Sequence, residues 1–122
     1  MNILVVDDEE LICWSLKKAI EGHGKHSVTC VHNGNDAINN ILQNKYDLII
    51  TDIRLPDISG LEIIKKLKDL NINIPVIMMS AHLSHDVIFD VSDYGIVGFV
   101  NKPFQIEDIL NNMNNISNPL HI

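Results

Sequence analysis

Five polar residues of this 122-residue sequence stand at or near the ends of short apolar runs. The runs end at Asp7 and Asp8, at Asp52, at Ser80 and just before Lys102. The runs themselves are almost purely apolar, so charged or hydroxyl groups at four such ends are not typical of ordinary solvated loops. A carboxylate nucleophile beside a divalent cation, a lysine and a hydroxyl is the set of groups that phosphoryl transfer onto an aspartate requires.

The same carboxylates indicate a metal site. Three carboxylates held within a few ångströms repel one another strongly and need a cation between them. A ligand set of oxygens alone favours a hard ion, and few protein ligands completed by water favour Mg²⁺ over Ca²⁺. We therefore expect Mg²⁺ at Asp7, Asp8 and Asp52 if the fold brings them together. Lys102 would add a fixed positive charge, and the Ser80 hydroxyl would donate a hydrogen bond to a phosphoryl oxygen.

The elements that must position these residues follow from the hydrophobic pattern. Short runs rich in β-branched residues alternate with longer stretches of helical spacing. Strands are expected at 3–6, 27–31, 48–51, 75–79 and 96–100, and helices at 9–22, from about 35, from about 61, across 83–91 and from about 105. In the second helix Ala37, Ile38, Ile41 and Leu42 are expected to face inward. Trp14 lies off the main apolar stripe of the first helix and is expected to be half-buried.

This alternation predicts a doubly wound α/β fold, a single domain over residues 1–122 with a five-stranded parallel sheet and helices on both faces. In such folds ligands bind outside the carboxyl ends of the strands, where the strand order reverses. With the order 2-1-3-4-5, strands 1 and 3 are neighbours and Asp7 meets Asp52, whereas the order 3-2-1-4-5 would separate them. The end of strand 2 offers no charged or hydroxyl group comparable to the others.

Composition narrows the classes of function. Sixteen acidic residues against nine Lys and Arg give a formal net charge of −7, which disfavours direct binding of nucleic acid. No apolar run approaches the ~18 residues that span a membrane. The N-terminal segment lacks the basic region of a signal peptide, so a cytoplasmic location is expected. Cys13 and Cys30 lack CxxC spacing and are expected to be reduced structural thiols.

The chain resembles the receiver domain of bacterial two-component response regulators over essentially its whole length. The stretches that carry the resemblance are Ile3–Glu9, Asp52–Gly60, Met79–Ala81 and Lys102–Phe104. Each stretch alone is a weak motif, but all of them in this order at the expected strand ends are highly specific. The resemblance implies the flavodoxin-like (βα)5 receiver fold with strand order 2-1-3-4-5.

The resemblance also implies roles for individual residues. Asp52 would be the phosphoacceptor, and Lys102 would pair with a phosphoryl oxygen. Mg²⁺ would be held by Asp8 directly, by Asp7 partly through water, by Asp52 and by the backbone carbonyl of Arg54.

Four further features follow from the same resemblance. The Ser80 hydroxyl would bind the phosphoryl group, and Phe99 matches the aromatic residue of the conformational switch. Arg54 and His82, two residues past Asp52 and Ser80, would flank the phosphoryl group and tune the access of water. The Lys102–Pro103 bond is expected to be cis.

The function so implied is a signalling switch. A histidine kinase or a phosphotransfer protein would supply the phosphoryl group. The surface of helix 4, strand 5 and helix 5 would then change and control an output domain or partner protein, with transcription regulation as the expected output. Phosphorylation-dependent homodimers are possible in such a switch, and turnover catalysis is not expected. The alternatives are a stand-alone phosphorelay receiver, a degenerate receiver that only binds partners, and an aspartate-nucleophile phosphatase of the haloacid-dehalogenase type. The phosphatase is disfavoured because Asp7 and Asp8 are adjacent, where that class has a D-x-D motif.

Simpler interpretations apply to each residue taken alone. Asp7 and Asp8 would also suit an acidic helix start, which the helix dipole favours. Ser80 would serve as a helix cap, and Lys102 as a surface lysine. The set of residues, rather than any one of them, favours the functional interpretation.

Overall fold

Five parallel strands form one sheet in the computed structural model, which describes residues 1–81 and 95–117. The strands are β1 (Asn2–Val6), β2 (Ser27–Val31), β3 (Leu48–Asp52), β4 (Val76–Ser80) and β5 (Ile96–Asn101). Their order is β2-β1-β3-β4-β5, as the family resemblance implies. This order confirms the predicted fold class and makes β1 and β3 neighbours.

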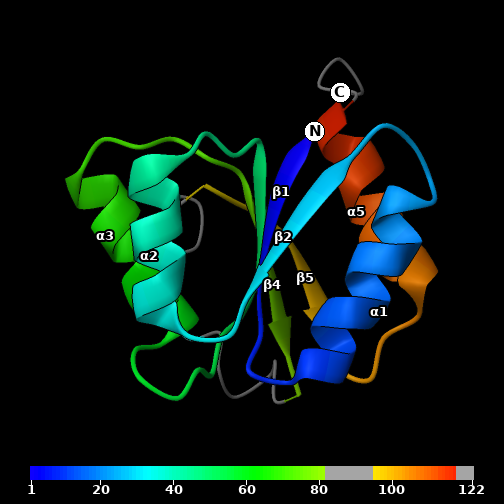
Figure 1. Ribbon diagram of the computed structural model, residues 1–122, viewed down its shortest axis with the longest axis horizontal. Helices are drawn as coiled ribbons and strands as arrows, with labels where there is room; N and C mark the ends of the chain where they lie inside the picture. Colours follow the sequence, from blue (N-terminus) through cyan, green and yellow to red (C-terminus); the bar gives the residue numbers. More distant parts are fainter. Residues whose placement is uncertain (82–94, 118–122) are drawn as a thin grey trace.

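Helices cover both faces of the sheet (Figure 1). Within the described residues they are α1 (Glu10–Glu21), α2 (Gly34–Gln43), α3 (Gly60–Asp69) and α5 (Ile106–Ser117). Helices α1 and α5 lie on one face, and α2 and α3 lie on the other. The helix expected across 83–91 falls outside the described residues. No helix in the described part of the chain is long and apolar enough to cross a membrane.

The central strands are apolar because both of their faces are covered. In β1 the residues Ile3–Val6 are all fully buried, and every residue of β3 and β4 is buried as well. The edge strand β2 instead exposes Ser27 and Thr29 and buries Val28 and Val31. This difference explains why β2 gives the weaker strand signal in the sequence.

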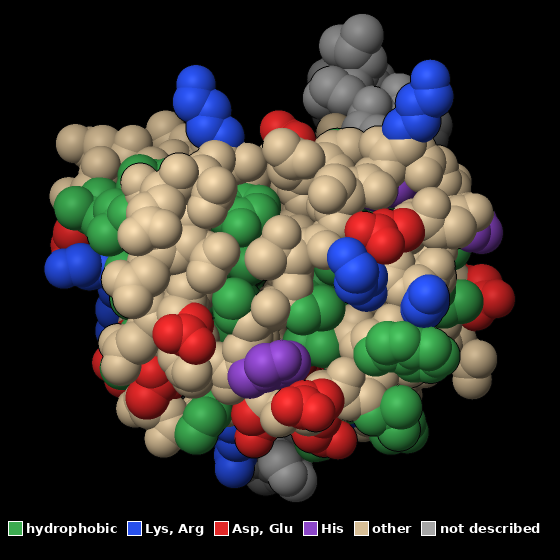
Figure 2. All heavy atoms as spheres, viewed as in Figure 1, with side chains coloured by type: hydrophobic (Ala, Val, Ile, Leu, Met, Phe, Trp, Pro, Cys, Tyr) green, Lys and Arg blue, Asp and Glu red, His purple; other side chains and the backbone are tan. Residues whose placement is uncertain are grey.

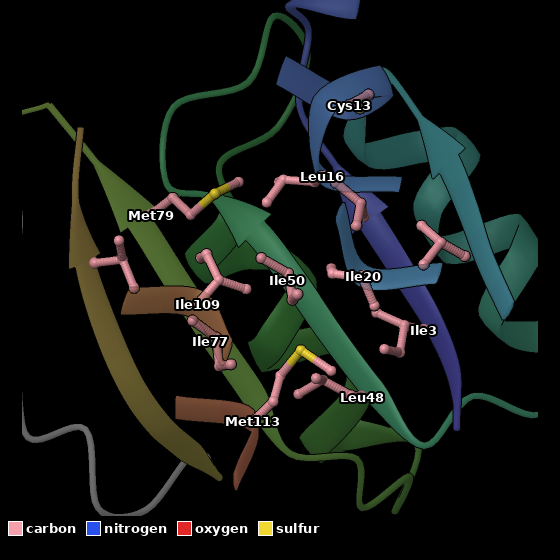
Figure 3. Packing of buried hydrophobic residues seen from close by; sticks show 13 residues of the cluster. Ile3, Cys13, Leu16, Ile20, Leu48, Ile50, Ile77, Met79, Ile109 and Met113 are labelled. Atoms are coloured by element: carbon pink, nitrogen blue, oxygen red, sulfur yellow. The ribbon is translucent and has the colours of Figure 1, made fainter. Parts of the chain in front are cut away.

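Two hydrophobic cores form, one on each face of the sheet. The core beneath α1 and α5 is shown in Figure 3, and its buried members include Cys13, Leu16 and Ile20 from α1 and Ile109 and Met113 from α5. The core beneath α2 and α3 is built from the opposite faces of the same strands, and its buried members include Leu4, Val6, Ala37, Ile41, Ile49, Ile63, Ile64, Leu67 and Met78. Alternate residues of one strand therefore anchor helices on opposite faces, which fixes all strand ends relative to one another.

Two expectations about helix faces are wrong. Leu42 is 56% exposed rather than inward-facing, because it lies one residue past the buried Ile41, about 100° around the helix from it, while α2 packs on β1 and α3. Trp14 is 57% exposed rather than half-buried. Its ring lies on the outer side of α1, with the Lys18 ammonium 5.9 Å from the ring centroid. That distance is within the range of a cation–π contact.

Candidate functional site

The predicted chemical residues converge at the carboxyl edge of the sheet, the lower edge in Figure 1. Val6 pairs with Thr51, so Asp7 and Asp52 follow neighbouring positions of β1 and β3. Asp52 pairs with Met79, and Ser80 pairs with Asn101 immediately before Lys102. Figure 2 shows acidic side chains gathered at this edge.

Three carboxylates form the centre of the site. Each of Asp7, Asp8 and Asp52 offers one oxygen, and these oxygens lie within 4.8 Å of one another. Asp7 is fully buried, Asp52 is 8% exposed and Asp8 is exposed. The cluster is therefore walled by protein on one side and open to water at Asp8.

Lys102 is the cation of the site. Its Nζ lies 2.6 Å from Oδ2 of Asp7 and 2.6 Å from Oδ2 of Asp52, and Glu9 Oε1 lies 3.7 Å away. The lysine side chain is only 11% exposed. Its backbone N–H also donates to the Ser80 carbonyl at 2.8 Å, which ties β5 to the end of β4. A nearly buried ammonium group requires such partners, because burial of an unpaired charge is costly.

The pKa values reflect one cation shared by several anions. Burial raises the pKa of Asp7, although hydrogen bonds from Lys102 and from the Glu9 N–H act in the opposite direction. Burial alone would lower the pKa of Lys102, but its hydrogen bonds to Asp52 and Asp7 raise it instead. Both directions are consistent, because Lys102 gains from two carboxylates while Asp7 has only part of one ammonium. Three carboxylates lie beside the single ammonium of Lys102, so this group of side chains carries net negative charge.

Backbone groups orient the two buried carboxylates. The Glu9 N–H donates to Asp7 Oδ1 at 2.9 Å, and the Arg54 N–H donates to Asp52 Oδ1 at 3.1 Å. At the start of α3, the Gly60 N–H donates to the Ile53 carbonyl at 2.7 Å. A Cβ at Gly60 would collide with the Asp52 carbonyl oxygen, so this approach requires glycine. The phosphoacceptor candidate is held by the loop that follows it.

The remaining predicted residues are placed as follows. Ser80 is buried at the end of β4. Phe99 in β5 is half-buried, pairs with Met78 and packs against the core beneath α2 and α3. Arg54 is exposed next to Asp52. His82 lies outside the described residues. The Lys102–Pro103 bond is cis, as expected.

Sequence reasoning missed two contributors. Glu9 reaches Lys102 from the start of α1. The end of β2, to which the sequence interpretation assigned no part, also contacts the site: His32 Nδ1 lies 2.9 Å from the Asp7 backbone oxygen, and the Asp7 N–H donates to the Val31 carbonyl at 3.1 Å. The sequence signal was a polar residue directly after the strand, but its partner is a main-chain atom that no residue type reveals.

The donor set fits a hard divalent cation. All three side chains offer carboxylate oxygens, and the exposure of Asp8 leaves room for water ligands of the kind that Mg²⁺ retains. The net negative charge that remains beside Lys102 gives a cation a favourable place.

The family model of the response regulator receiver domain matches residues 3–114. The chain belongs to this family. Among curated relatives, this receiver domain is 37% identical over 109 residues to the uncharacterized transcriptional regulatory protein YkoG of Bacillus subtilis, a match that covers 89% of the chain and 47% of that protein. The chain thus spans about half the length of YkoG.

Solved structures show the same fold. The Francisella response regulator 1452 receiver domain is 30% identical with a TM-score of 0.86, and the match covers 98% of each chain. The response regulator TrrA of Thermotoga maritima, solved in complex with Mg²⁺-BeF, is 30% identical with a TM-score of 0.82 over 94% of this receiver domain and 97% of TrrA.

Proposed function

We propose that this receiver domain is a phosphorylation-dependent signalling switch that accepts a phosphoryl group on Asp52. The observation that supports the proposal most directly is the shared contact of Lys102 Nζ, 2.6 Å from both Asp52 and Asp7, beside three clustered carboxylates. A carboxylate oxygen of Asp52 attacks the phosphorus of a phosphohistidine donor. The O–P bond forms, the N–P bond breaks, and the imidazole leaves as a neutral ring after taking a proton.

The surrounding residues have distinct roles in this step. Asp7, Asp8, Asp52 and the Arg54 carbonyl would hold Mg²⁺, which would supply positive charge beside the transferred phosphoryl group. The Mg²⁺-BeF complex of TrrA supports this assignment. Lys102 neutralises a phosphoryl oxygen. Ser80 at the end of β4 donates its hydroxyl hydrogen to another.

Phosphorylation would then shift an existing conformational equilibrium. Ser80 moves toward the phosphoryl group and Phe99 turns further inward. The surface formed by β5, α5 and the segment that joins β4 to β5 changes as a result. A sensor histidine kinase or phosphotransfer protein supplies the phosphoryl group in the cytoplasm. The output is an attached domain or partner protein in transcription regulation, in line with the name of the relative YkoG. Phosphorylated copies could also pair as homodimers. Arg54 and His82 tune hydrolysis, and the protein does not turn over an external substrate.

The experiment that tests the proposal is phosphorylation by acetyl phosphate, followed by mass spectrometry of the intact protein. We expect one phosphoryl adduct with Mg²⁺ and none with EDTA. Asp52→Asn should abolish the adduct, whereas Asp69→Asn, at the exposed end of α3, should leave it unchanged. Uptake by Asp52→Asn at the normal rate would refute the assignment. Steady release of phosphate from small phosphomonoesters would indicate a phosphatase instead.

A further inference from the structure

The β2–α2 turn, residues 32–35 including the first two residues of α2, touches both loops that carry the proposed metal ligands. On one side His32 contacts the Asp7 backbone oxygen at 2.9 Å. A carbonyl oxygen only accepts hydrogen bonds, so Nδ1 of His32 must be the donor. On the other side the Asp57 carboxylate accepts two backbone N–H groups, from Gly34 at 2.7 Å and from Asn35 at 2.8 Å. The turn thus bridges the loop after β1 and the loop after β3.

Close packing reinforces the bridge to the second loop. Gly34 is buried, and a Cβ at this position would collide with the Ile58 side chain and would lie 3.2 Å from Asp57 Oδ1. Ile58 in turn packs against the core beneath α2 and α3. The backbone of the turn and the loop after β3 are therefore in direct contact.

The loop after β3, residues 53–59, is short and is held at its far end by the hydrogen bond from Gly60 to Ile53. Asp57 lies three residues after Arg54, with Pro56 between them. Proline fixes its own φ and restricts the residue before it, so a displacement at Asp57 is transmitted toward Arg54. The Arg54 N–H orients the Asp52 carboxylate.

We propose that Asp57 is a positioning residue of the phosphoacceptor site: by binding the N-terminus of α2, it fixes the loop whose Arg54 N–H orients Asp52 and whose Arg54 carbonyl would hold Mg²⁺. The proposal rests on the function proposed above. It differs from a purely structural role, in which Asp57 would only stabilise α2 through the helix dipole and two hydrogen bonds.

Asn33 provides the matched control. It caps the same end of α2, its Oδ1 accepting from the Asp36 N–H at 2.8 Å, but its side-chain bonds remain within α2. Asp57→Ala and Asn33→Ala should therefore weaken the same helix end, while only Asp57→Ala releases the loop. Asp57→Asn keeps one side-chain acceptor oxygen, so it should retain part of the contact between the loop after β3 and the N-terminus of α2.

The test is calorimetric titration of the metal-free protein with Mg²⁺ alone, together with urea unfolding of each variant. Direct outer partners of metal ligands typically contribute 10–100-fold to metal affinity. Because Asp57 acts through the loop backbone, we expect Asp57→Ala to weaken Mg²⁺ binding by about 3–10-fold, Asp57→Asn by less, and Asn33→Ala not at all.

Equal Mg²⁺ affinity in the wild type, Asp57→Ala and Asp57→Asn would overturn the positioning role while leaving the proposed function intact. The same holds if Asn33→Ala weakens Mg²⁺ binding as much as Asp57→Ala does. Failure of the proposed function is recognised separately, because the wild type would then take up no phosphoryl group at Asp52.

Discussion

The ammonium group of Lys102 lies 2.6 Å from carboxylate oxygens of both Asp7 and Asp52. Removal of this ammonium group would leave two nearly buried carboxylates facing one another. The free energy of unfolding should then fall by more than it does when a surface ion pair is lost. The matched comparison is Lys17, whose ion pair with Glu21 at 3.1 Å is 43% exposed on the lysine side.

Lys102→Met should lower the free energy of unfolding by about 3–5 kcal/mol in EDTA, because two buried carboxylates lose their shared partner. Added Mg²⁺ should recover part of the loss, since a ligand of the folded state stabilises it by mass action. Lys17→Met should cost about 1 kcal/mol or less. Urea unfolding with and without Mg²⁺ measures all of these values. Equal losses for the two lysines would contradict the shared-cation interpretation.

The pH dependence of stability should differ in sign between Asp7 and Asp57. The pKa of Asp7 is raised by burial, so its contribution to stability is greatest below its ordinary value of 3.8 and is lost as the pH rises through the folded value. Asp7→Asn should therefore stabilise the metal-free protein at neutral pH and remove the stabilisation by Mg²⁺. If it instead destabilises the metal-free protein at pH 7, the carboxylate is fully compensated by Lys102.

The opposite behaviour is expected at Asp57. Burial acts to raise the pKa of this carboxyl, but backbone hydrogen bonds from Asn35 and Gly34 outweigh it and lower the pKa. Its contribution is thus present above the ordinary value of 3.8 and is lost as the pH falls through the folded value. Asp57→Asn should flatten the acid side of the stability profile, measured by urea unfolding between about pH 3 and pH 6. An unchanged profile would refute the hydrogen-bonding role.

At the scale of elements, the junction of β3 and α3 determines the position of Asp52. Gly60→Ala would push a methyl group into the Asp52 carbonyl oxygen. Such overpacking typically costs about 1–3 kcal/mol. We therefore expect Gly60→Ala to be less stable by this amount and to accept the phosphoryl group more slowly at saturating Mg²⁺.

Gly22→Ala is the control, because a Cβ there would lie 3.1 Å from the Lys18 carbonyl at the far end of α1, remote from the carboxyl edge of the sheet. It should leave the rate of phosphoryl uptake unchanged. Urea unfolding and the acetyl phosphate assay measure both effects, and a normal rate in folded Gly60→Ala would argue against precise positioning by this junction.

Much of this arrangement is predictable because it is local. The apolar runs of β1, β3 and β4 are encoded residue by residue, and the polar groups that follow them mark the carboxyl edge. Convergence of Asp7 and Asp52 is not local, since it depends on strand order, which the family resemblance supplied. The part played by the end of β2 was missed because His32 binds a main-chain oxygen. The expected burial of Leu42 and Trp14 was wrong, because the spacing of apolar residues gives the centre of the buried face of a helix but not its width.

At the scale of the whole molecule, the two cysteines report on how the domain opens. Both are free, Cys13 buried and Cys30 half-buried, and burial raises both thiol pKa values. A thiol reagent attacks the thiolate, so both should react slowly in the folded protein. Cys13 should react only through opening of the core beneath α1 and α5, and Mg²⁺ should slow that reaction. Alkylation followed by mass spectrometry measures the two rates. Fast labelling of Cys13 with a folded circular dichroism spectrum would contradict the packing.

The position of Trp14 has a practical consequence for spectroscopy. It is the sole tryptophan of the chain, and its indole faces solvent on the outer side of α1 beneath Lys18. Its emission should already be red-shifted in the native protein and should change little on denaturation, so circular dichroism is the better probe of unfolding. The same indole is a built-in fluorophore for events on the outer surface of α1, where a bound macromolecule would shift its emission to the blue without any label.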